Sequence, residues 1–167
     1  MKNIVLIGMM GCGKTTVGRL LARRMGRELA DTDALIEQRE RRSISDIFAR
    51  EGEAYFRALE LELCRELSGR EGLVIACGGG LPTQDEAIAA LKGNGLVFWL
   101  DRDPGETYDG LDVSGRPLAQ GGREAFLARY QQRTPVYRRW ADHTVRAKSP
   151  QIAAALIDAI ITEESET

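Results

Sequence analysis

The sequence is poor in the residues that build metal centres and disulfide frameworks. It contains one histidine, His143, and three cysteines, Cys12, Cys64 and Cys77, and no two cysteines form a C-x-x-C pair. A zinc site of ordinary ligand spacing cannot be assembled from this set, and three cysteines cannot complete a disulfide framework. We therefore expect the thiols to be small buried side chains in a reducing compartment, without a catalytic role.

The sequence also lacks a strong charge of one sign and a long apolar run. The formal net charge is -2 and aromatic residues make up only 6%, which argues against a nucleic-acid-binding surface. No apolar run approaches the roughly 20 residues of a membrane span, and the N-terminus does not read as a signal peptide. We expect no nucleic-acid or membrane partner and a cytoplasmic location.

The composition is that of one compact α/β domain covering residues 1–167. A hydrophobic fraction of 43% suffices for a buried core, and a charged fraction of 29% suits a solvated surface. Short apolar runs alternate with helical patterns, which indicates βαβ units around a parallel sheet. The apolar runs predict strands at 2–7, 28–31, 73–77 and 96–100.

Helical periodicity and capping signals fill the spaces between these strands. A helix is predicted after the first strand up to Met25, and another is predicted to start at Ser43, with Asp46 as its capping partner. Further helices are expected over Phe56 to Leu67, after Thr83 with Glu86 as a cap, and from Ser149 and Pro150 onward. The polar tail from 163 to 167 is expected to fray.

One stretch breaks the alternation of strands and helices. From about Asp109 to Gly122 no periodicity is visible, and glycines stand at 110, 115, 121 and 122. A long segment without regular structure inside a compact domain is more often a functional lid than filler. We therefore predict a lid at about 109–123.

Residues 8–15 read G-M-M-G-C-G-K-T, which matches the phosphate-binding pattern G-x-x-x-x-G-K-[ST] in full. A hydrophobic strand precedes the loop and an amphipathic helix follows it. Glycines let backbone N–H groups curl around phosphate oxygens, and the helix start adds its positive dipole end. Lys14 is expected to reach the β- and γ-phosphates of ATP, and the Thr15 hydroxyl to bind magnesium. The other nucleotide-binding residues expected here are Gly11, Cys12, Gly13 and, in a supporting place on the helix, Thr16.

Asp31 and Asp33 follow the second predicted strand, at the edge of the sheet that also carries the phosphate loop. Asp31 could hold magnesium through water, while Asp33 faces the acceptor and takes or orients its hydroxyl proton. The alternative is a helix N-cap, a position that aspartate favours, and Asp33 could serve in both ways.

An arginine and a run of glycines complete the candidate site. Arg57 stands one turn into a predicted helix with Glu60 near it, which suits a grip on a substrate carboxylate or, more plainly, a surface ion pair. Gly78, Gly79 and Gly80 directly follow the third strand, where three glycines indicate close approach of a ligand or backbone. A plain tight turn is the alternative.

In combination these motifs closely resemble the shikimate kinase family. The phosphate loop, Asp31-x-Asp33, Gly52-Glu53-x-x-Phe56-Arg57, the triple glycine, Arg116-Pro117-Leu118 and Arg133-x-x-x-Tyr137 occur in the order and spacing of the family. The likeness runs from about residue 2 to 161. It implies a P-loop kinase fold, a three-layer α/β/α sandwich with a five-stranded parallel sheet of order 2-3-1-4-5. It also implies ATP-dependent phosphorylation of the 3-hydroxyl of shikimate.

The resemblance assigns further roles residue by residue. Asp33 would bind the acceptor hydroxyls, Arg57 and Arg133 would clamp the carboxylate, and Gly79 with its neighbours Gly78 and Gly80 would border the acceptor. Arg116 would act on the transferring phosphate as part of the lid. The segment 148–150, with Lys148 and Pro150, would border the adenine. The acceptor-binding segment would span about 33–61, and the enzyme would be a monomer.

The lid departs from the family pattern, which leaves two alternatives open. Asp109 stands where the family usually has a basic residue, Asp112 is close by, and the motif after them reads Arg-Pro-Leu-Ala. An acidic lid would suit an acceptor with an amino group, such as homoserine. A regulatory nucleotide-binding module without transfer activity is the second alternative. Because Lys14, Asp33 and Arg57 are all present, the sequence favours an active kinase acting on shikimate.

Overall fold

The computed structural model of the chain describes residues 1–111 and 121–167. Within these residues five parallel strands form one sheet in the order β2-β3-β1-β4-β5, as the resemblance implied. The strands are β1 (Asn3–Ile7), β2 (Glu28–Asp31), β3 (Leu73–Ala76), β4 (Gly95–Leu100) and β5 (His143–Val145).

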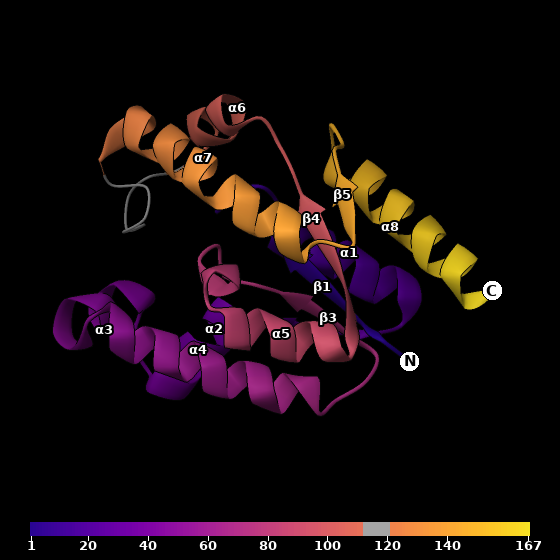
Figure 1. Ribbon diagram of the computed structural model, residues 1–167, viewed down its shortest axis with the longest axis horizontal. Coiled ribbons are helices and arrows are strands. Elements are labelled where there is room, and N and C mark those ends of the chain that lie inside the picture. Colours follow the sequence, from indigo (N-terminus) through magenta and orange to yellow (C-terminus); the bar gives the residue numbers. More distant parts are fainter. Residues whose placement is uncertain (112–120) are drawn as a thin grey trace.

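Helices connect the strands and cover the sheet (Figure 1). They are α1 (Lys14–Met25), α2 (Thr32–Glu40), α3 (Ile44–Glu51), α4 (Glu53–Ser68), α5 (Asp85–Gly93), α6 (Pro104–Asp109), α7 (Gly122–Trp140) and α8 (Pro150–Ser165). A short 3-10 turn over Leu81–Thr83 leads from the loop after β3 into α5. No helix in the described part of the chain is both long and apolar enough to cross a membrane.

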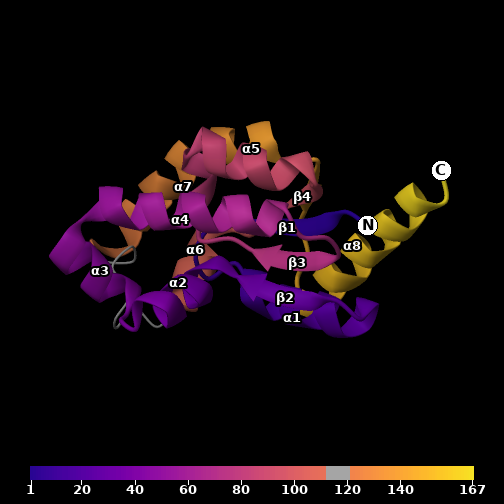
Figure 2. The ribbon, with the colours of Figure 1, turned by 90° about the horizontal axis from the view of Figure 1, so that it is seen from below.

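The central strand β1 is fully buried and presents alternate residues to two separate cores. Val5 and Ile7 pack on the face that α4, α5 and α7 cover, whereas Ile4 and Leu6 pack on the face that α1 and α8 cover. Figure 2 shows α4, α5 and α7 on one side of the strands and α1 on the other. This arrangement is the expected three-layer α/β/α sandwich.

The strand register brings the candidate site residues to one edge of the sheet. Leu6 of β1 pairs with Ala76 of β3, and Ala76 pairs with Asp31 of β2. The segments that follow these strands therefore leave the sheet side by side. They are the phosphate loop, the Asp31–Asp33 segment and the triple glycine, so the predicted placement at the carboxyl edge is confirmed.

Two of the predicted helix starts are confirmed and a third is wrong. Ser43 accepts a hydrogen bond from the backbone N–H of Asp46, and Ser149 caps α8 in the same way. Thr83, in contrast, does not cap α5. It lies in the 3-10 turn, so its hydroxyl points back and donates to the carbonyl of Gly80 at 2.5 Å, and α5 begins one residue after Gln84.

The C-terminal third departs from the expectations in three places. The tail does not fray from residue 163, because α8 continues to Ser165. Helix α7 and strand β5 were not predicted, because no periodic pattern in the sequence indicates them. The segment 109–123 begins in α6 and ends in α7, so its two ends are helical, and residues 112–120 lie outside the described residues.

Candidate active site

The phosphate loop joins the end of β1 to the start of α1. Gly11 and Gly13 have φ angles of 77° and 97°, a left-handed conformation in which a side chain would be strained. These turns place Lys14 at the first position of α1, where free backbone N–H groups and the helix dipole favour an anion. The Lys14 ammonium is buried and donates to the carbonyl oxygens of Gly8 at 2.6 Å and Met9 at 2.8 Å. Its charge is therefore held inside the curve of the loop.

Thr15 and Asp31 meet across the gap between α1 and β2. The Thr15 hydroxyl donates to Asp31 Oδ2 at 2.8 Å, and Asp31 Oδ1 accepts from the backbone N–H of Ala34 at 3.1 Å. Asp31 is thus the N-cap of α2. The N-cap alternative considered for Asp33 is wrong, because Asp33 lies two positions further on, inside the first turn of the helix.

The Asp33 carboxyl group is partly buried between α2 and the loop that follows β3. A Cβ atom at Gly78 would lie 2.5 Å from Asp33 Oδ1, so the carboxyl group rests directly on this glycine. Burial raises the pKa of Asp33 above its ordinary value, and the negative charge of Asp31 raises the pKa further, while Lys14 and Arg57 oppose the rise. A carboxylate of raised pKa beside a phosphate loop is suited to accept a proton.

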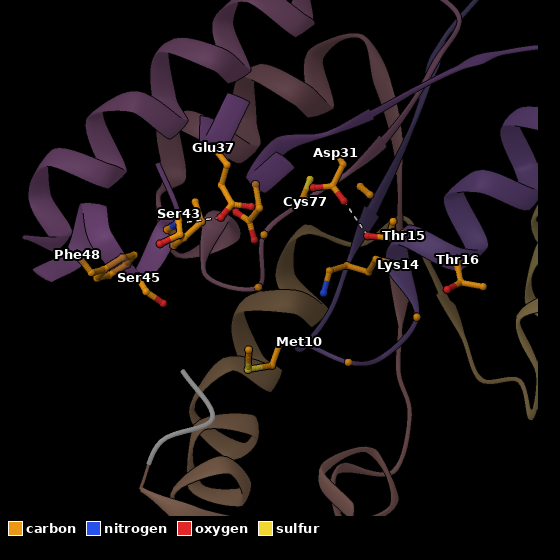
Figure 3. A pocket seen from close by; sticks show the side chains of 17 residues that line it. Met10, Lys14, Thr15, Thr16, Asp31, Glu37, Ser43, Ser45, Phe48 and Cys77 are labelled. Carbon is orange, nitrogen blue, oxygen red and sulfur yellow. Dashed lines mark hydrogen bonds between the residues drawn. The ribbon is translucent and has the colours of Figure 1, made fainter. Parts of the chain in front are cut away.

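A cavity of about 520 Å³ connects the phosphate loop to Asp33 (Figure 3). Figure 3 shows Lys14, Thr15 and Asp31 at one end of this cavity and Ser45 and Phe48 at the other. Its size fits a small metabolite beside the terminal phosphate of a nucleotide. The predicted site residues that line it are Gly11, Gly13, Lys14, Thr15, Thr16, Asp31, Asp33, Gly78 and Gly79.

The triple glycine is packed against three of the predicted site residues. Gly78 contacts Asp33, and a Cβ atom at Gly79 would lie 3.2 Å from Arg133 Nη1. A Cβ atom at Gly80 would overlap the guanidinium of Arg57. Each glycine therefore gives room to a charged side chain, and the alternative of a plain tight turn does not account for this packing.

Arg57 forms a buried ion pair, so the surface-pair alternative for this residue is wrong. Its Nη1 donates to Glu60 Oε1 at 2.7 Å, and the exposed fractions of the two side chains are 14% and 0%. Glu53, which is mostly exposed, accepts more weakly from the same guanidinium at 3.3 Å. Burial raises the pKa of Glu60, and the charge of Arg57 opposes that rise. The pair holds a guanidinium in a fixed orientation against Gly80.

Helix α7 contributes Arg133 and Tyr137 to the same loop. The Tyr137 hydroxyl is buried and donates to the carbonyl oxygen of Gly79 at 2.7 Å. Burial raises the pKa of Tyr137 to about 12, so the phenol keeps its proton and remains a donor. Arg133 and Arg57 thus approach the glycine loop from different helices, α7 and α4, and Gly79 of this loop lines the cavity.

The predicted adenine-binding residues lie beyond the phosphate loop, near the ends of β4 and β5. Cys12 and Pro150 line one small cavity of about 20 Å³. Lys148 lines a neighbouring open cavity of about 620 Å³. Both cavities are bordered by Arg102 and Ala147, so the structure brings the segment 148–150 close to the phosphate loop.

Cys64 and Cys77 have the surroundings of inert core residues. All three cysteines are free and buried, as expected. Burial raises the pKa of Cys64 to about 12 and raises that of Cys77 well above its ordinary value. A thiol that keeps its proton is a poor nucleophile.

Some predicted residues do not line the cavity, and some lining residues were not predicted. Arg57, Gly80 and Arg133 do not line it, although Arg57 packs against Gly80 and Arg133 against Gly79. Arg116 lies outside the described residues. Sequence reasoning missed the lining residues Met10, Glu37, Ser43, Ile44, Ser45, Phe48, Ala76 and Cys77. Glu37 had a usable signal, because it follows Asp33 by one helical turn and lies on the same face of α2.

Comparison with known proteins identifies the family. A family profile described as "Shikimate kinase" matches residues 10–163. A shikimate kinase of Pelotomaculum thermopropionicum is 43% identical over 159 residues, which cover 93% of this chain and 92% of the relative. A shikimate kinase of Clostridium botulinum is 41% identical over 140 residues, covering 83% of this chain and 84% of the relative.

Solved structures lead to the same family. A shikimate kinase from Acinetobacter baumannii in complex with shikimate superposes with a TM-score of 0.91 at 35% identity, covering 98% of this chain and 94% of that one. A shikimate kinase from Aquifex aeolicus gives a TM-score of 0.86 at 34% identity, with 98% of each chain covered. Since the profile, the relatives and the structures agree over nearly the whole chain, this protein belongs to the shikimate kinase family.

Proposed function

We propose that this protein transfers the γ-phosphoryl group of ATP to the 3-hydroxyl of shikimate, a step in aromatic amino-acid biosynthesis. One observation carries the proposal. A single cavity of about 520 Å³ has the phosphate loop at one end and the partly buried carboxyl group of Asp33 in its wall. A phosphate donor and a hydroxyl acceptor can therefore meet in it. The 43% identical relative is named a shikimate kinase.

On the donor side, the start of α1 and Lys14 bind the phosphates. Phosphoryl transfer spreads negative charge over the phosphate oxygens, and a fixed ammonium near them stabilises the transition state. When the nucleotide binds, the Lys14 ammonium donates to these phosphate oxygens in place of the carbonyl oxygens of Gly8 and Met9. The backbone from Gly11 through Cys12 to Gly13 and the side chain of Thr16 complete the phosphate site, and Lys148 and Pro150 border the adenine.

Thr15 and Asp31 fit a magnesium ion. Their oxygens lie 2.8 Å apart and belong to a hydroxyl and a carboxylate, the ligand types that magnesium prefers. The described residues contain no group of three histidine, cysteine or acidic side chains placed to hold a metal ion. Such a cluster is not required, since magnesium is commonly held by one or two side chains together with water and phosphate oxygens. When bound, the ion would neutralise phosphate charge.

On the acceptor side, Asp33 orients the hydroxyl and takes its proton as the oxygen attacks phosphorus. Arg57 and Arg133 bind the carboxylate of shikimate, and Gly78, Gly79 and Gly80 border the ring. The two guanidinium groups lie against neighbouring glycines, which supports a shared anionic ligand. Arg116 is proposed to act on the transferring phosphate from the segment at about 109–123.

The homoserine alternative is not favoured. It was raised by the acidic residues Asp109 and Asp112; Asp112 lies outside the described residues, and Asp109 forms an ion pair with Arg123, whose Nε donates to it at 3.2 Å. Its charge is therefore matched by a protein cation. The regulatory-module alternative is also not favoured, because Lys14, Thr15, Asp31 and Asp33 are assembled around one cavity. A monomeric state and a cytoplasmic location remain predictions.

The test is ADP release from ATP and magnesium in the presence of single acceptors. We expect release to depend on shikimate, with little release with homoserine or with no acceptor. Release with homoserine alone would support the related kinase. Binding of ATP without ADP release for either acceptor would support the regulatory module.

A further inference from the structure

Gln84 stands at the start of α5 but does not cap that helix. It occupies the N-cap position, where a short polar side chain usually accepts a hydrogen bond from its own helix, yet its side chain makes no capping bond. The amide of Gln84 instead reaches across to α4. Its Nε2 donates to Glu60 Oε1 at 2.9 Å and to the backbone carbonyl oxygen of Arg57 at 3.1 Å.

These contacts attach Gln84 to the buried ion pair. Glu60 is fully buried, and its Oε1 accepts both the 2.9 Å bond from Gln84 and a 2.7 Å bond from Arg57 Nη1. Its other oxygen, Oε2, has no hydrogen-bond partner among residues 1–111 and 121–167. Two donors on one oxygen therefore hold the whole carboxylate. Without Gln84, Arg57 alone would remain to fix the orientation of Glu60.

The position of the Arg57 guanidinium depends on the orientation of Glu60. The guanidinium is packed so closely against Gly80 that even one added carbon atom there would overlap it. A rotation of Glu60 would therefore move the guanidinium away from the glycine loop. A displaced guanidinium loses the bidentate pair of hydrogen bonds that arginine forms with a carboxylate. We propose that Gln84 is a positioning residue for the acceptor site, which fixes Arg57 through Glu60 and so contributes to recognition of the carboxylate of shikimate.

This inference rests on the proposed function, in which Arg57 binds that carboxylate. A second explanation is a purely structural tie, because the same amide also joins α5 to α4. The chain offers a matched control at the other end of α5. Asn94 Nδ2 donates to the backbone carbonyl of Arg70 at 3.0 Å, which is a side-chain amide tie of the same kind far from the cavity.

The experiment compares Gln84→Ala and Gln84→Met with Asn94→Ala and with the wild type. Methionine keeps much of the length of glutamine but has no donor, so it separates the lost hydrogen bonds from lost packing. We expect both Gln84 variants to raise the KM for shikimate about tenfold, as for lost bonds to a charged group. Their kcat and their KM for ATP should stay within about twofold of the wild type. Asn94→Ala should leave the KM for shikimate unchanged.

The decisive measurement uses an acceptor analogue without the carboxylate. Inhibition constants are measured for shikimate with its carboxylate replaced by hydroxymethyl. If Gln84 acts through Arg57, the wild type and the Gln84 variants should bind this analogue within about twofold of each other. An equal loss for analogue and shikimate, or an unchanged KM for shikimate in folded variants, would overturn the inference. A wild type that releases no ADP with shikimate would overturn the proposed function, and this inference with it.

Discussion

The hydroxyl of Tyr137 donates a 2.7 Å hydrogen bond to the carbonyl oxygen of Gly79. This bond joins α7, which carries Arg133, to the glycine loop that borders the cavity. The Tyr137 side chain is fully buried, so a water molecule could take the place of its hydroxyl only by entering the core. The bond therefore fixes the distance between Arg133 and the glycine loop.

Tyr137→Phe should weaken acceptor binding and stability together. Removing the hydroxyl leaves the Gly79 carbonyl without this donor, which typically costs about 1 kcal/mol in the free energy of unfolding. The KM for shikimate should rise several-fold while the KM for ATP changes little. Steady-state kinetics and urea unfolding measure the two effects. Tyr130→Phe is the control, because it removes a 2.7 Å bond from the same helix to Asp101, and a similar rise in its acceptor KM would contradict the prediction.

Gly78→Ala should nearly abolish activity because the added carbon displaces the proposed base. The new Cβ atom would lie 2.5 Å from Asp33 Oδ1, closer than van der Waals contact allows, so the carboxyl group has to move. Gly93→Ala is the control, since a Cβ atom there meets nothing within 4 Å. It should keep full kcat and leave stability equal or slightly raised. Normal kcat in a folded Gly78→Ala protein would show that Asp33 is not held by this contact.

Much of the fold was predictable because its strands are short apolar runs and its phosphate loop has a distinctive spacing. Helix α7 was not, and Pro135 inside it is one physical reason, since proline lacks the backbone donor that a helix interior uses. Phe126 and Tyr137 are the buried side chains of α7, and they are too far apart in the sequence to produce a helical periodicity of apolar residues. Strand β5 has three residues, of which only Val145 is buried.

The site was predictable where one side chain performs one role in a fixed motif, as for Lys14 and Thr15. It was less so where the role depends on burial. From their spacing alone, Arg57 and Glu60 look like a surface pair. Only the packing of the folded chain, with α4 against α5, reveals that Glu60 is buried and Arg57 mostly so. Gln84 carries no motif, because its partners lie 24 and 27 residues away in the sequence.

Lys14→Met should abolish phosphoryl transfer in a folded protein. The methionine keeps the apolar stem but removes the charge proposed to lie on the transferring phosphate, a loss that typically costs several kcal/mol of transition-state stabilisation. The carbonyls of Gly8 and Met9 also lose their donor, so the free energy of unfolding should fall by about 1–2 kcal/mol. ADP release and thermal unfolding are the measurements. A kcat near that of the wild type would contradict the assignment of the phosphate site.

Asp33→Asn should lower kcat strongly and yet stabilise the protein at neutral pH. Asparagine keeps the shape of the side chain but cannot accept the proton of the acceptor hydroxyl, so the reaction loses its base. In the wild type, burial raises the pKa of Asp33, so loss of activity on acidification should begin at a higher pH than for an ordinary aspartate. The pH dependence of kcat/KM on the acidic side measures this loss of activity.

The stability effect follows from the same shift in pKa. Because the pKa of Asp33 is higher in the folded than in the unfolded state, the folded state binds the proton more tightly. The stability that this proton provides is fully present below the ordinary pKa of aspartate and is lost as the pH rises through the raised value. The gain from Asp33→Asn should therefore be largest at neutral pH and shrink as the pH falls toward about 4. Asp46→Asn is the control, since this exposed aspartate also lies in the first turn of a helix and should give no gain at neutral pH. Urea unfolding of both variants from pH 4 to 8 measures the difference, and a gain for Asp33→Asn that does not depend on pH would refute the electrostatic origin.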